Sequence, residues 1–288
     1  MKKIILISFV LININNLAFA DTDKAIRLDA SLSYDDNLNR SPTDTTAIES
    51  AFATAVAGYN ISYPMNTRNF IDYRLLAKYE GYQDTDGLNN AEISAGVTYH
   101  YKPVAGFLKA MYIFKGDIHV TDFETDIRDR TAYEASAMVS FWVTNTLSFR
   151  SGLTARKRDS DSRVFDTKDY RVFFNADLML SRHSTLYTTL NFLTGDLVST
   201  IPLDDSDNEV LDVVRQAEVI EFDPTFGDNM IAYKLDADIA ALTLGYNYVL
   251  GKKQSLDLSA RYAVGQSDYD VDYDALFFNI SYLVSFRL

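Results

Sequence analysis

The stretch from Asp274 to the C-terminal Leu288 constrains the fold more than any other part of the chain. Alternation with a period of two predicts a β-strand and not a helix. A strand that closes a barrel in lipid needs one apolar face, because lipid covers the outside and neighbouring strands satisfy every backbone group. The apolar row consists of Leu276, Phe278, Ile280, Tyr282, Val284, Phe286 and Leu288, and the residues between them are mostly small or polar.

The N-terminal residues have the pattern of an export signal. Met1 to Lys3 is a basic start, Ile4 to Ile12 is largely apolar, and Ala18 to Ala20 has the form of a cleavage site. Asparagines at positions 13, 15 and 16 keep the apolar run shorter than the ~20 residues that span a bilayer. We therefore expect a signal peptide, residues 1–20, cleaved after Ala20, and a mature chain, residues 21–288, that forms one domain.

Composition is consistent with a membrane protein that lacks transmembrane helices. The chain is 47% hydrophobic, yet after the signal peptide no run reaches the ~20 apolar residues of a helical span. Its 19 Tyr and 18 Phe are typical of aromatic girdles at the two surfaces of a bilayer. The chain has no Cys, which excludes disulfides, and its net charge of −13 argues against nucleic acid as a partner.

Alternating segments recur along the mature chain, joined in turn by short turns and longer acidic loops. They predict an all-β fold, a transmembrane antiparallel up-and-down β-barrel of about twelve strands, with the termini and short turns periplasmic and the long loops extracellular. The expected strands are Ala25–Tyr34, Ala51–Tyr63, Asn69–Tyr82, Ala91–Tyr101, Ala105–His119, Ala132–Val143, Leu147–Arg158, Asp169–Leu180, Thr185–Leu197, Tyr233–Tyr248, Leu256–Val264 and Asp274–Leu288.

A soluble β-sandwich or lipocalin-like barrel is the alternative. One face of its strands meets water, so its outward rows would carry more Lys, Glu and Thr than these rows do. The signal peptide, the hairpins and the closing Tyr282-Leu283-Val284-Ser285-Phe286-Arg287-Leu288 resemble the bacterial outer-membrane β-barrel (porin-like) superfamily. In that superfamily the barrel-assembly machinery reads the last strand, which most often ends on Phe, whereas this chain ends on Leu288. The resemblance implies an outer-membrane location, with lipid and lipopolysaccharide as surroundings.

Charged residues of both signs fall on the rows expected to face the lumen. We expect a basic ladder and an acidic ladder that face each other and set a transverse field, which orients and screens small charged solutes. A salt-bridged, closed interior is the alternative, since a barrel of this size lies between filled and open ones. The predicted pore-lining residues are Arg74, Lys78, Arg150, Arg156, Arg158, Arg171, Asp236, Asp238, Asp257 and Arg261.

Two segments near the C-terminal third depart from simple alternation. The apolar phase changes between Ile239 and Leu242, which predicts a β-bulge near Ala240-Ala241. The long non-strand stretch Ser199–Asn229 has capping-box spacing at Ser206 to Glu209, followed by apolar residues at helical intervals. We expect it to be one long extracellular loop that carries either a short helix folded into the mouth or no fixed structure.

The sequence also contains candidate metal-binding and hydrolase residues. Asp268, Asp270, Asp272 and Asp274 alternate near the last loop, but a solvated acidic rim fits them better than a Ca²⁺ site, because no Gly provides the sharp turn. His119 with Asp117 and Asp122 is the one group that suggests a hydrolase. We therefore expect no cofactor, no metal and no enzymatic activity.

The sequence thus predicts a monomeric outer-membrane channel for passive passage of small hydrophilic solutes. A non-conducting structural or surface-binding barrel, such as an adhesin or receptor, is the alternative, and an outer-membrane hydrolase is a third. The solute is not indicated, because the basic ladder favours anions whereas acidic loops oppose their approach.

Overall fold

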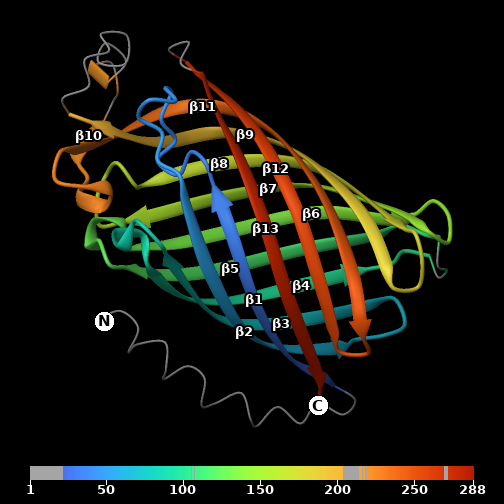
Figure 1. Cartoon of the computed structure of the whole chain (residues 1–288). Coiled ribbons are helices and arrows are strands. Elements are labelled where there is room, and N and C mark those ends of the chain that lie inside the picture. Colours follow the sequence, from blue (N-terminus) through green and yellow to red (C-terminus); the bar gives the residue numbers. More distant parts are fainter. Residues whose placement is uncertain are drawn as a thin grey trace.

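The chain forms a closed, antiparallel, up-and-down β-barrel, which confirms the predicted fold class (Figure 1). The computed structural model describes residues 22–104, 106, 108–203, 214, 215, 217, 219–268 and 272–288. The strands that close the barrel are β1 (Asp23–Asp35), β2 (Ser50–Pro64), β3 (Asn69–Tyr82), β4 (Asn90–Tyr101), β5 (Met111–Phe123), β6 (Arg130–Trp142), β7 (Leu147–Ser160), β8 (Thr167–Met179), β9 (Ser184–Pro202), β11 (Met230–Gly251), β12 (Gln254–Ser267) and β13 (Asp272–Arg287). A short further strand, β10 (Val219–Phe222), pairs with β11 beyond the end of β12.

The barrel closes where β13 pairs with β1. The two strands are in antiparallel register along most of β1. At the very end, the Leu288 N–H donates to the Lys24 carbonyl at 2.8 Å, and Arg287 forms an ion pair with Asp23 at 2.7 Å. Closure leaves the barrel wall without an open edge, so each barrel strand has a hydrogen-bonded neighbour on both sides. Among the described residues, no helix is long and apolar enough to cross a bilayer.

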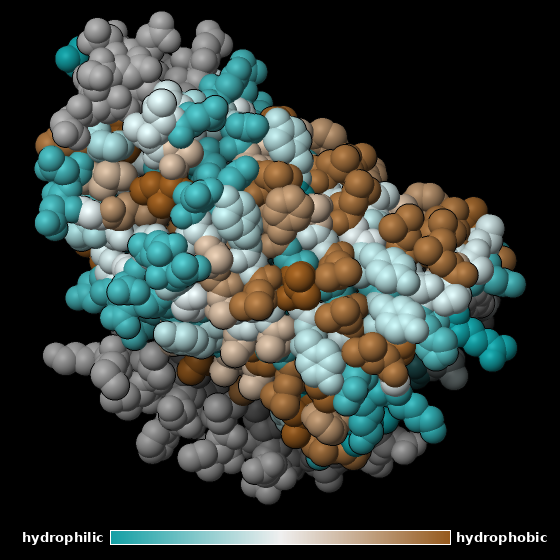
Figure 2. Space-filling view, viewed as in Figure 1, coloured by the Kyte–Doolittle hydropathy of each residue, from teal (hydrophilic) through white to brown (hydrophobic). Residues whose placement is uncertain are grey.

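The outer face carries the expected apolar rows. Leu28 and Leu32 on β1 and Ile280 and Tyr282 on β13 are all exposed on this side. Figure 2 shows apolar side chains spread over the body of the barrel and hydrophilic ones gathered toward its two ends. An apolar outer surface with aromatic belts near both ends is the surface that a barrel needs in lipid. The exposed tyrosines form two groups. Those nearer one end are Tyr79, Tyr133, Tyr170 and Tyr262, and those nearer the other end are Tyr59, Tyr73, Tyr101, Tyr112, Tyr248 and Tyr282.

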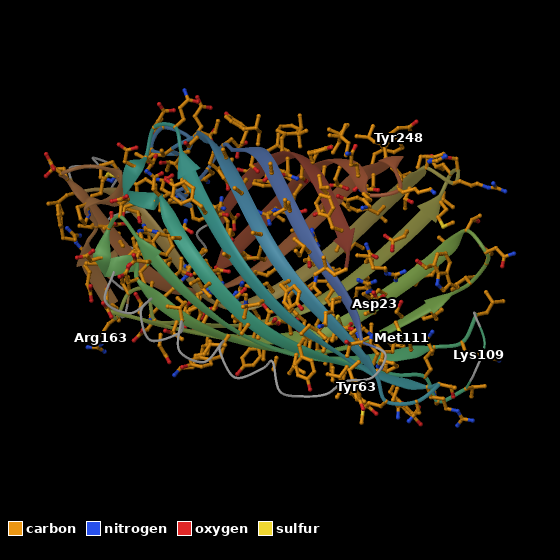
Figure 3. The ribbon with its side chains drawn as sticks, turned by 90° about the horizontal axis from the view of Figure 1, so that it is seen from below. Asp23, Tyr63, Lys109, Met111, Arg163 and Tyr248 are labelled. Carbon is orange, nitrogen blue, oxygen red and sulfur yellow. The ribbon has the colours of Figure 1, made fainter. Side chains whose placement is uncertain are left out.

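The two ends of the barrel differ in their connections. At one end, which we call the turn end, lie both ends of the described chain and the short turns between β2 and β3, β6 and β7, β8 and β9, and β11 and β12. Figure 3 labels Asp23, Tyr63, Met111 and Tyr248 there, and Arg163 at the opposite end. That opposite end, the loop end, carries the 3₁₀ turns η3 (Asp86–Leu88), η4 (Asp126–Arg128) and η5 (Pro224–Phe226).

Some predicted boundaries change. β5 begins at Met111 and not at Ala105. The stretch Ser199–Asn229 is not all loop, because β9 continues to Pro202 and β10 lies within it. The capping sequence of the expected helix lies outside the described residues, as does the expected signal peptide, so both remain predictions.

The predicted bulge in β11 is wrong. Its register with β9 is continuous from Met230 to Tyr248, so the side chains alternate without interruption past Ala240-Ala241. The apolar phase changes because the environment changes: toward the loop end, the row that includes Tyr233 and Leu235 faces inward into a small apolar cluster. Tyr233 is fully buried there and Leu235 is 5% exposed.

This cluster explains how β11 is anchored beyond the barrel wall. Tyr233 and Leu235 pack with Ile201 of β9 and with Val214 and Ala217 of the segment that follows β9. At Gly195, where pairing of β9 with β8 ends, φ is +136°, and a Cβ would lie 2.4 Å from a backbone oxygen of β8. Past this glycine, β9 and β11 remain paired with each other and extend beyond β8 as an arm at the loop end.

The inward placement of this row can be tested by thiol labelling, since the chain has no native Cys. We predict that Asp236→Cys in the detergent-folded barrel reacts rapidly with a water-soluble maleimide, because this side chain lies on the exposed outer face. Leu235→Cys, its neighbour on the buried face, should react at least about tenfold more slowly, since buried thiols are inert. Faster labelling of Leu235→Cys than of Asp236→Cys would contradict this placement and support the predicted bulge.

Candidate functional site: an arginine chamber

A cavity of about 540 Å³ lies inside the loop-end part of the barrel. Its most unusual property is the number of guanidinium groups on its walls, and we call it the arginine chamber. They are Arg40, Arg128, Arg130, Arg156, Arg158, Arg171 and Arg261.

Strand register places four of these arginines on one wall. Arg130 is the first residue of β6, Arg156 and Arg158 lie on β7, and Arg171 lies on β8, all on the inward row. Arg171 is opposite Thr154 across the β7–β8 pair, and Arg156 is opposite Asp169. Arg261 of β12 and Arg40 of the loop after β1 lie on the other side of the cavity, so cations surround it.

Few carboxylates neutralise this wall. Asp169 accepts hydrogen bonds from Arg156 Nε at 3.0 Å and from Arg158 Nη1 at 2.9 Å, so one carboxylate serves two guanidiniums. No described carboxylate lies within ion-pair distance of Arg130, Arg171 or Arg261. The Arg171 Nε is buried without a hydrogen-bond partner.

Aromatic rings hold several of these side chains instead. Arg130 lies over the Phe123 ring at 5.0 Å, and Arg261 lies over the Phe277 ring at 5.1 Å. A ring face attracts a cation electrostatically but uses none of its in-plane N–H donors. These two guanidiniums are therefore positioned while their donors stay available.

The remaining wall is mostly apolar, with Thr167, Asn191 and Asp196 as its polar residues. Strands β9 and β11 to β13 contribute small aliphatic side chains and one aromatic ring to the cavity. Tyr273 is 8% exposed and packs over Gly265, where any Cβ would overlap its ring. The apolar lining consists of Leu193, Leu197, Val198, Ile239, Ala241, Ala263, Tyr273 and Ala275, with Phe165 from a loop.

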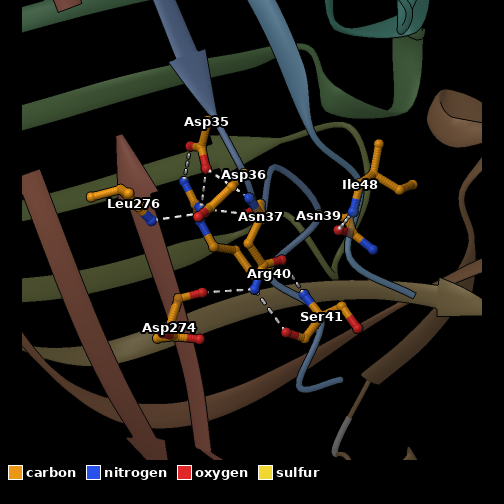
Figure 4. A network of polar contacts seen from close by, with 9 residues as sticks. All are labelled: Asp35, Asp36, Asn37, Asn39, Arg40, Ser41, Ile48, Asp274 and Leu276. Carbon is orange, nitrogen blue, oxygen red and sulfur yellow. Dashed lines mark hydrogen bonds and ion pairs between the residues drawn. The ribbon is translucent and has the colours of Figure 1, made fainter. Parts of the chain in front are cut away.

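The loop after β1 is fixed by a network of polar contacts that places Arg40 (Figure 4). Arg40 donates to both oxygens of Asp35, at 3.0 and 2.8 Å, and adopts a positive φ of 54°. Burial opposes its charge, but the hydrogen bonds and charge of Asp35 outweigh burial and raise the pKa of the guanidinium. Asn37 donates to the Asp274 carbonyl at 2.8 Å, and Asp36 accepts from the Leu276 N–H at 2.7 Å, so the loop is attached to β13.

Loops at the loop end pack over the chamber and form a cap, which we define as η3, η4, the 161–166 loop and the β10–η5 segment. Its central contact is the ion pair between Arg128 Nη2 and Asp223 Oδ2, 2.5 Å long. Asp223 is fully buried and also accepts from Thr200 and from the Thr225 N–H. The Arg128 guanidinium lies against the Phe165 ring at 4.3 Å, so the cap forms part of the chamber wall.

Ionisation of Asp223 follows from these partners. Burial alone would raise the pKa of this carboxyl, but the charge and hydrogen bond of Arg128, with the donors of Thr225, lower it below the usual 3.8. The cap is therefore stabilised by this pair at neutral pH.

Below the chamber, the middle of the lumen holds a paired charge network. Lys115 lies 2.7 Å from Asp117 and 3.3 Å from Glu134, and Arg74 also pairs with Asp117. Lys78 lies between Glu80 and Glu92, at 3.3 and 3.5 Å. Each of these cations has a carboxylate partner, unlike three arginines of the chamber.

The structure brings together only part of the predicted pore lining. Arg156, Arg158, Arg171 and Arg261 line the chamber, whereas Arg74 and Lys78 lie in the mid-lumen network. Arg150 faces the lumen near the turn end, opposite Asn175. Asp257 is also inward, where Tyr187 donates to it at 2.8 Å.

Asp236 and Asp238 are corrections. Both lie on the exposed outer face of β11, because the expected bulge is not there and the strand alternates without a break. The predicted acidic ladder therefore does not face the basic one. The inward residues beside the arginines are apolar, since Leu193 pairs with Arg171 and Ile239 pairs with Leu193.

Three chamber arginines were not expected. Arg40 and Arg128 lie in loops, and sequence alternation gives no information on loop side chains. Arg130 had a signal: it is in phase with Glu134 and Ser136, so extending the predicted strand by two residues would place it inward.

The weaker sequence hypotheses can also be placed. His119 Nδ1 lies 3.0 Å from Glu92 in the lumen, and Asp117 belongs to the mid-lumen network. Asp122 lies on the opposite face of β5 from His119, so the three do not form one group. Within the described ranges, no cluster of three or more His, Asp or Glu side chains has the geometry of a metal site.

A larger hollow of about 1260 Å³ shares Arg171, Leu193 and Ile239 with the chamber. Its other lining residues include Tyr170 and Phe192, which lie on the outer face of the wall. Because it takes in both faces of a continuous hydrogen-bonded sheet, it is not one interior cavity. The chamber is therefore the better-defined site.

Comparison with known proteins places this architecture in a class. No protein-family model matches the chain, and no curated protein matches it. Among solved structures, an outer membrane channel from Pseudomonas putida F1 matches with a TM-score of 0.59 and 10% identity, over 93% of this chain and 97% of that one. The KdgM porin in complex with disordered oligogalacturonate matches with a TM-score of 0.47 and 10% identity, over 90% and 99%. The fold is that of the bacterial outer-membrane β-barrels.

The Arg128–Asp223 pair predicts a local effect of mutation. Arg128→Ala leaves the buried Asp223 carboxylate without its cation, which costs about 3–5 kcal/mol. We expect faster amide hydrogen exchange in β10 and η5, with little change in the barrel strands. Lys157→Ala, which removes an ion pair at the surface with Asp159, is the control and should change exchange little.

The same measurement has a pH dependence. Because the pKa of Asp223 is lowered on folding, the contribution of the pair is full at pH values above 3.8 and is lost as the pH falls through the lower folded pKa. Protection of β10 in the wild type should therefore stay constant from neutral pH down to 3.8. Loss of protection well above that pH, or an unchanged exchange rate in Arg128→Ala, would contradict the role of the pair in the cap.

Proposed function

We propose that the protein is an outer-membrane channel through which small hydrophilic solutes pass passively, and that it is not an enzyme. The observation that carries this proposal is the contrast between the two faces of the closed barrel. The outer face is apolar along the body, whereas the inner face is polar and charged from the turn end to the chamber. A barrel with this contrast separates lipid from a hydrated interior.

Partial exposure of the lumen charges supports a hydrated interior. The side chains of Arg74, Lys78 and Lys115 are 34%, 25% and 22% exposed although they face the lumen. Water therefore reaches the mid-lumen network, which a dry plug would not allow. The cap restricts the loop end, so the conducting pathway is narrow there.

The expected surroundings follow from the same proposal. The chain functions as a monomer in the outer membrane, is inserted by the barrel-assembly machinery through β13, and is surrounded by lipid and, on the outside, lipopolysaccharide. The apolar outward row of β13, from Leu276 to Leu288, supports its role as the assembly signal.

Single-channel recording in planar bilayers tests the proposal. We predict discrete conductance steps from the folded wild type, and a lower conductance for Asn175→Trp, because Asn175 faces the lumen and a bulky ring there narrows the pathway. Ala176→Trp, its neighbour on the outer face, is the matched control and should conduct like the wild type.

Wild-type protein that is folded and inserted but passes no current would contradict the channel and favour the non-conducting structural or surface-binding barrel. Equal conductance of Asn175→Trp and the wild type would contradict a pathway through this part of the lumen.

A further inference from the structure

We propose that the arginine chamber is a binding site for small organic anions that carry an apolar body, such as aromatic carboxylates. This proposal rests on the proposed function, because the solute would reach the chamber through the lumen. It is carried by the unpaired guanidiniums of Arg130, Arg171 and Arg261 and by the apolar side chains of β9 and β11 to β13 that lie between them.

The seven arginines of the chamber outnumber the carboxylates around them, which are Asp169 and Asp196 on the walls and Asp35 and Asp223 behind them. Of its seven arginines, Arg156 and Arg158 share Asp169, Arg40 pairs with Asp35, and Arg128 pairs with Asp223. The other three, Arg130, Arg171 and Arg261, have no ion-pair partner within the part of the chain that the structure describes. Burying cations together is unfavourable unless a counter-charge is present, so the chamber favours an anionic ligand.

The mid-lumen network shows that this imbalance is local. Arg74, Lys78 and Lys115 face the same lumen below the chamber. Each of them has a carboxylate within ion-pair distance. Arg150, near the turn end, also has no ion pair among the described residues, but its side chain is exposed. The three unpaired arginines of the chamber are instead partly buried.

The unpaired guanidiniums are also held in position. Phe123 lies under Arg130 and Phe277 under Arg261, and the Arg171 Nε is buried with no acceptor. A ring beneath the guanidinium restricts its orientation and leaves the N–H fork open at the edge. This fork matches the two oxygens of a carboxylate, which it binds bidentately.

The apolar wall selects among anions. Leu193 is the cross-strand partner of Arg171, and Ile239 is that of Leu193, so an apolar surface begins beside the arginine wall. Ala241 and the nearly buried Tyr273 and Ala275 extend this surface. An inorganic anion leaves that surface in contact with water, and a sugar acid places hydroxyls against it. An anion with a hydrocarbon or aromatic body buries it, at about 25 cal/mol per Å² of apolar area.

The size of the chamber fits this class. Its volume of about 540 Å³ lies within the range of small-molecule sites, roughly 300–1,000 Å³, and far exceeds one inorganic ion. Three available guanidiniums provide for more than one carboxylate. An aromatic dicarboxylate has both an apolar body and two carboxylates. Phthalate is therefore the probe of choice.

Isothermal titration of the detergent-folded barrel with phthalate tests the inference without requiring conductance. We expect saturable binding of phthalate, and binding at least about tenfold weaker for sulfate, which lacks the apolar body, and for dimethyl phthalate, which lacks the charge. Equal binding of sulfate would overturn the role of the apolar wall. Equal binding of dimethyl phthalate would overturn the role of the arginines.

Variants locate the site. Arg171→Gln and Arg261→Gln should each weaken phthalate binding by about ten- to a hundredfold, since each removes a charge-assisted hydrogen bond. Arg150→Gln, which removes a lumen arginine outside the chamber, should bind like the wild type. Hydrogen exchange of the barrel strands shows that each variant is folded.

Failure of the two proposals can be told apart. The chamber is not an anion site if the folded wild type does not bind phthalate, or if Arg150→Gln loses as much phthalate affinity as Arg171→Gln. Neither result contradicts the channel. Phthalate binding by a barrel that passes no current supports the site and contradicts the channel.

Discussion

The pairing of β13 with β1 is the constraint on which the rest of the structure depends. A membrane interior provides no water for unpaired backbone groups, so a sheet in lipid is stable only when its first and last strands meet. Here that seam is extended at both ends, by the Arg287–Asp23 ion pair at the turn end and by Asp36 and Asn37 at the loop end. The loop-end contacts also place Arg40, so closure of the barrel and construction of the chamber use the same residues.

Inside the closed wall, charge is organised in two layers. The middle layer is a network of cations and carboxylates that neutralise one another and remain partly hydrated. The upper layer is the chamber, where aromatic rings replace carboxylates as the partners of Arg130 and Arg261. The cap covers this layer and holds Arg128 through Asp223. The acidic loops and net charge of −13 oppose an approaching anion only over a Debye length of about 8 Å, whereas the chamber acts at contact.

Alternation predicted the barrel because a strand between lipid and water has a different requirement on each face. It placed β13 as the closing strand, which is confirmed. It also placed the β7 and β8 arginines on the row that faces inward in the structure. It failed on β11, where the inner face becomes dry toward the loop end. There the inward row is apolar, as at Tyr233, and the outward row carries Asp236 and Asp238. Alternation reports only the contrast between two faces, and the hydrophobicity of the inner face depends on cap and arm contacts that are distant in sequence.

Only part of the chamber could be predicted from the sequence, because alternation gives information on strands and not on loops. Arg156, Arg158, Arg171 and Arg261 lie on strands and followed from phase, whereas Arg40 and Arg128 are placed by loop hydrogen bonds with no sequence period. We propose that the arginines, and not the acidic residues, set the field along the pathway. The reversal potential of single channels in a KCl gradient measures this most directly. We predict a potential that reports a preference for Cl⁻ over K⁺, and a preference for K⁺ would contradict this proposal.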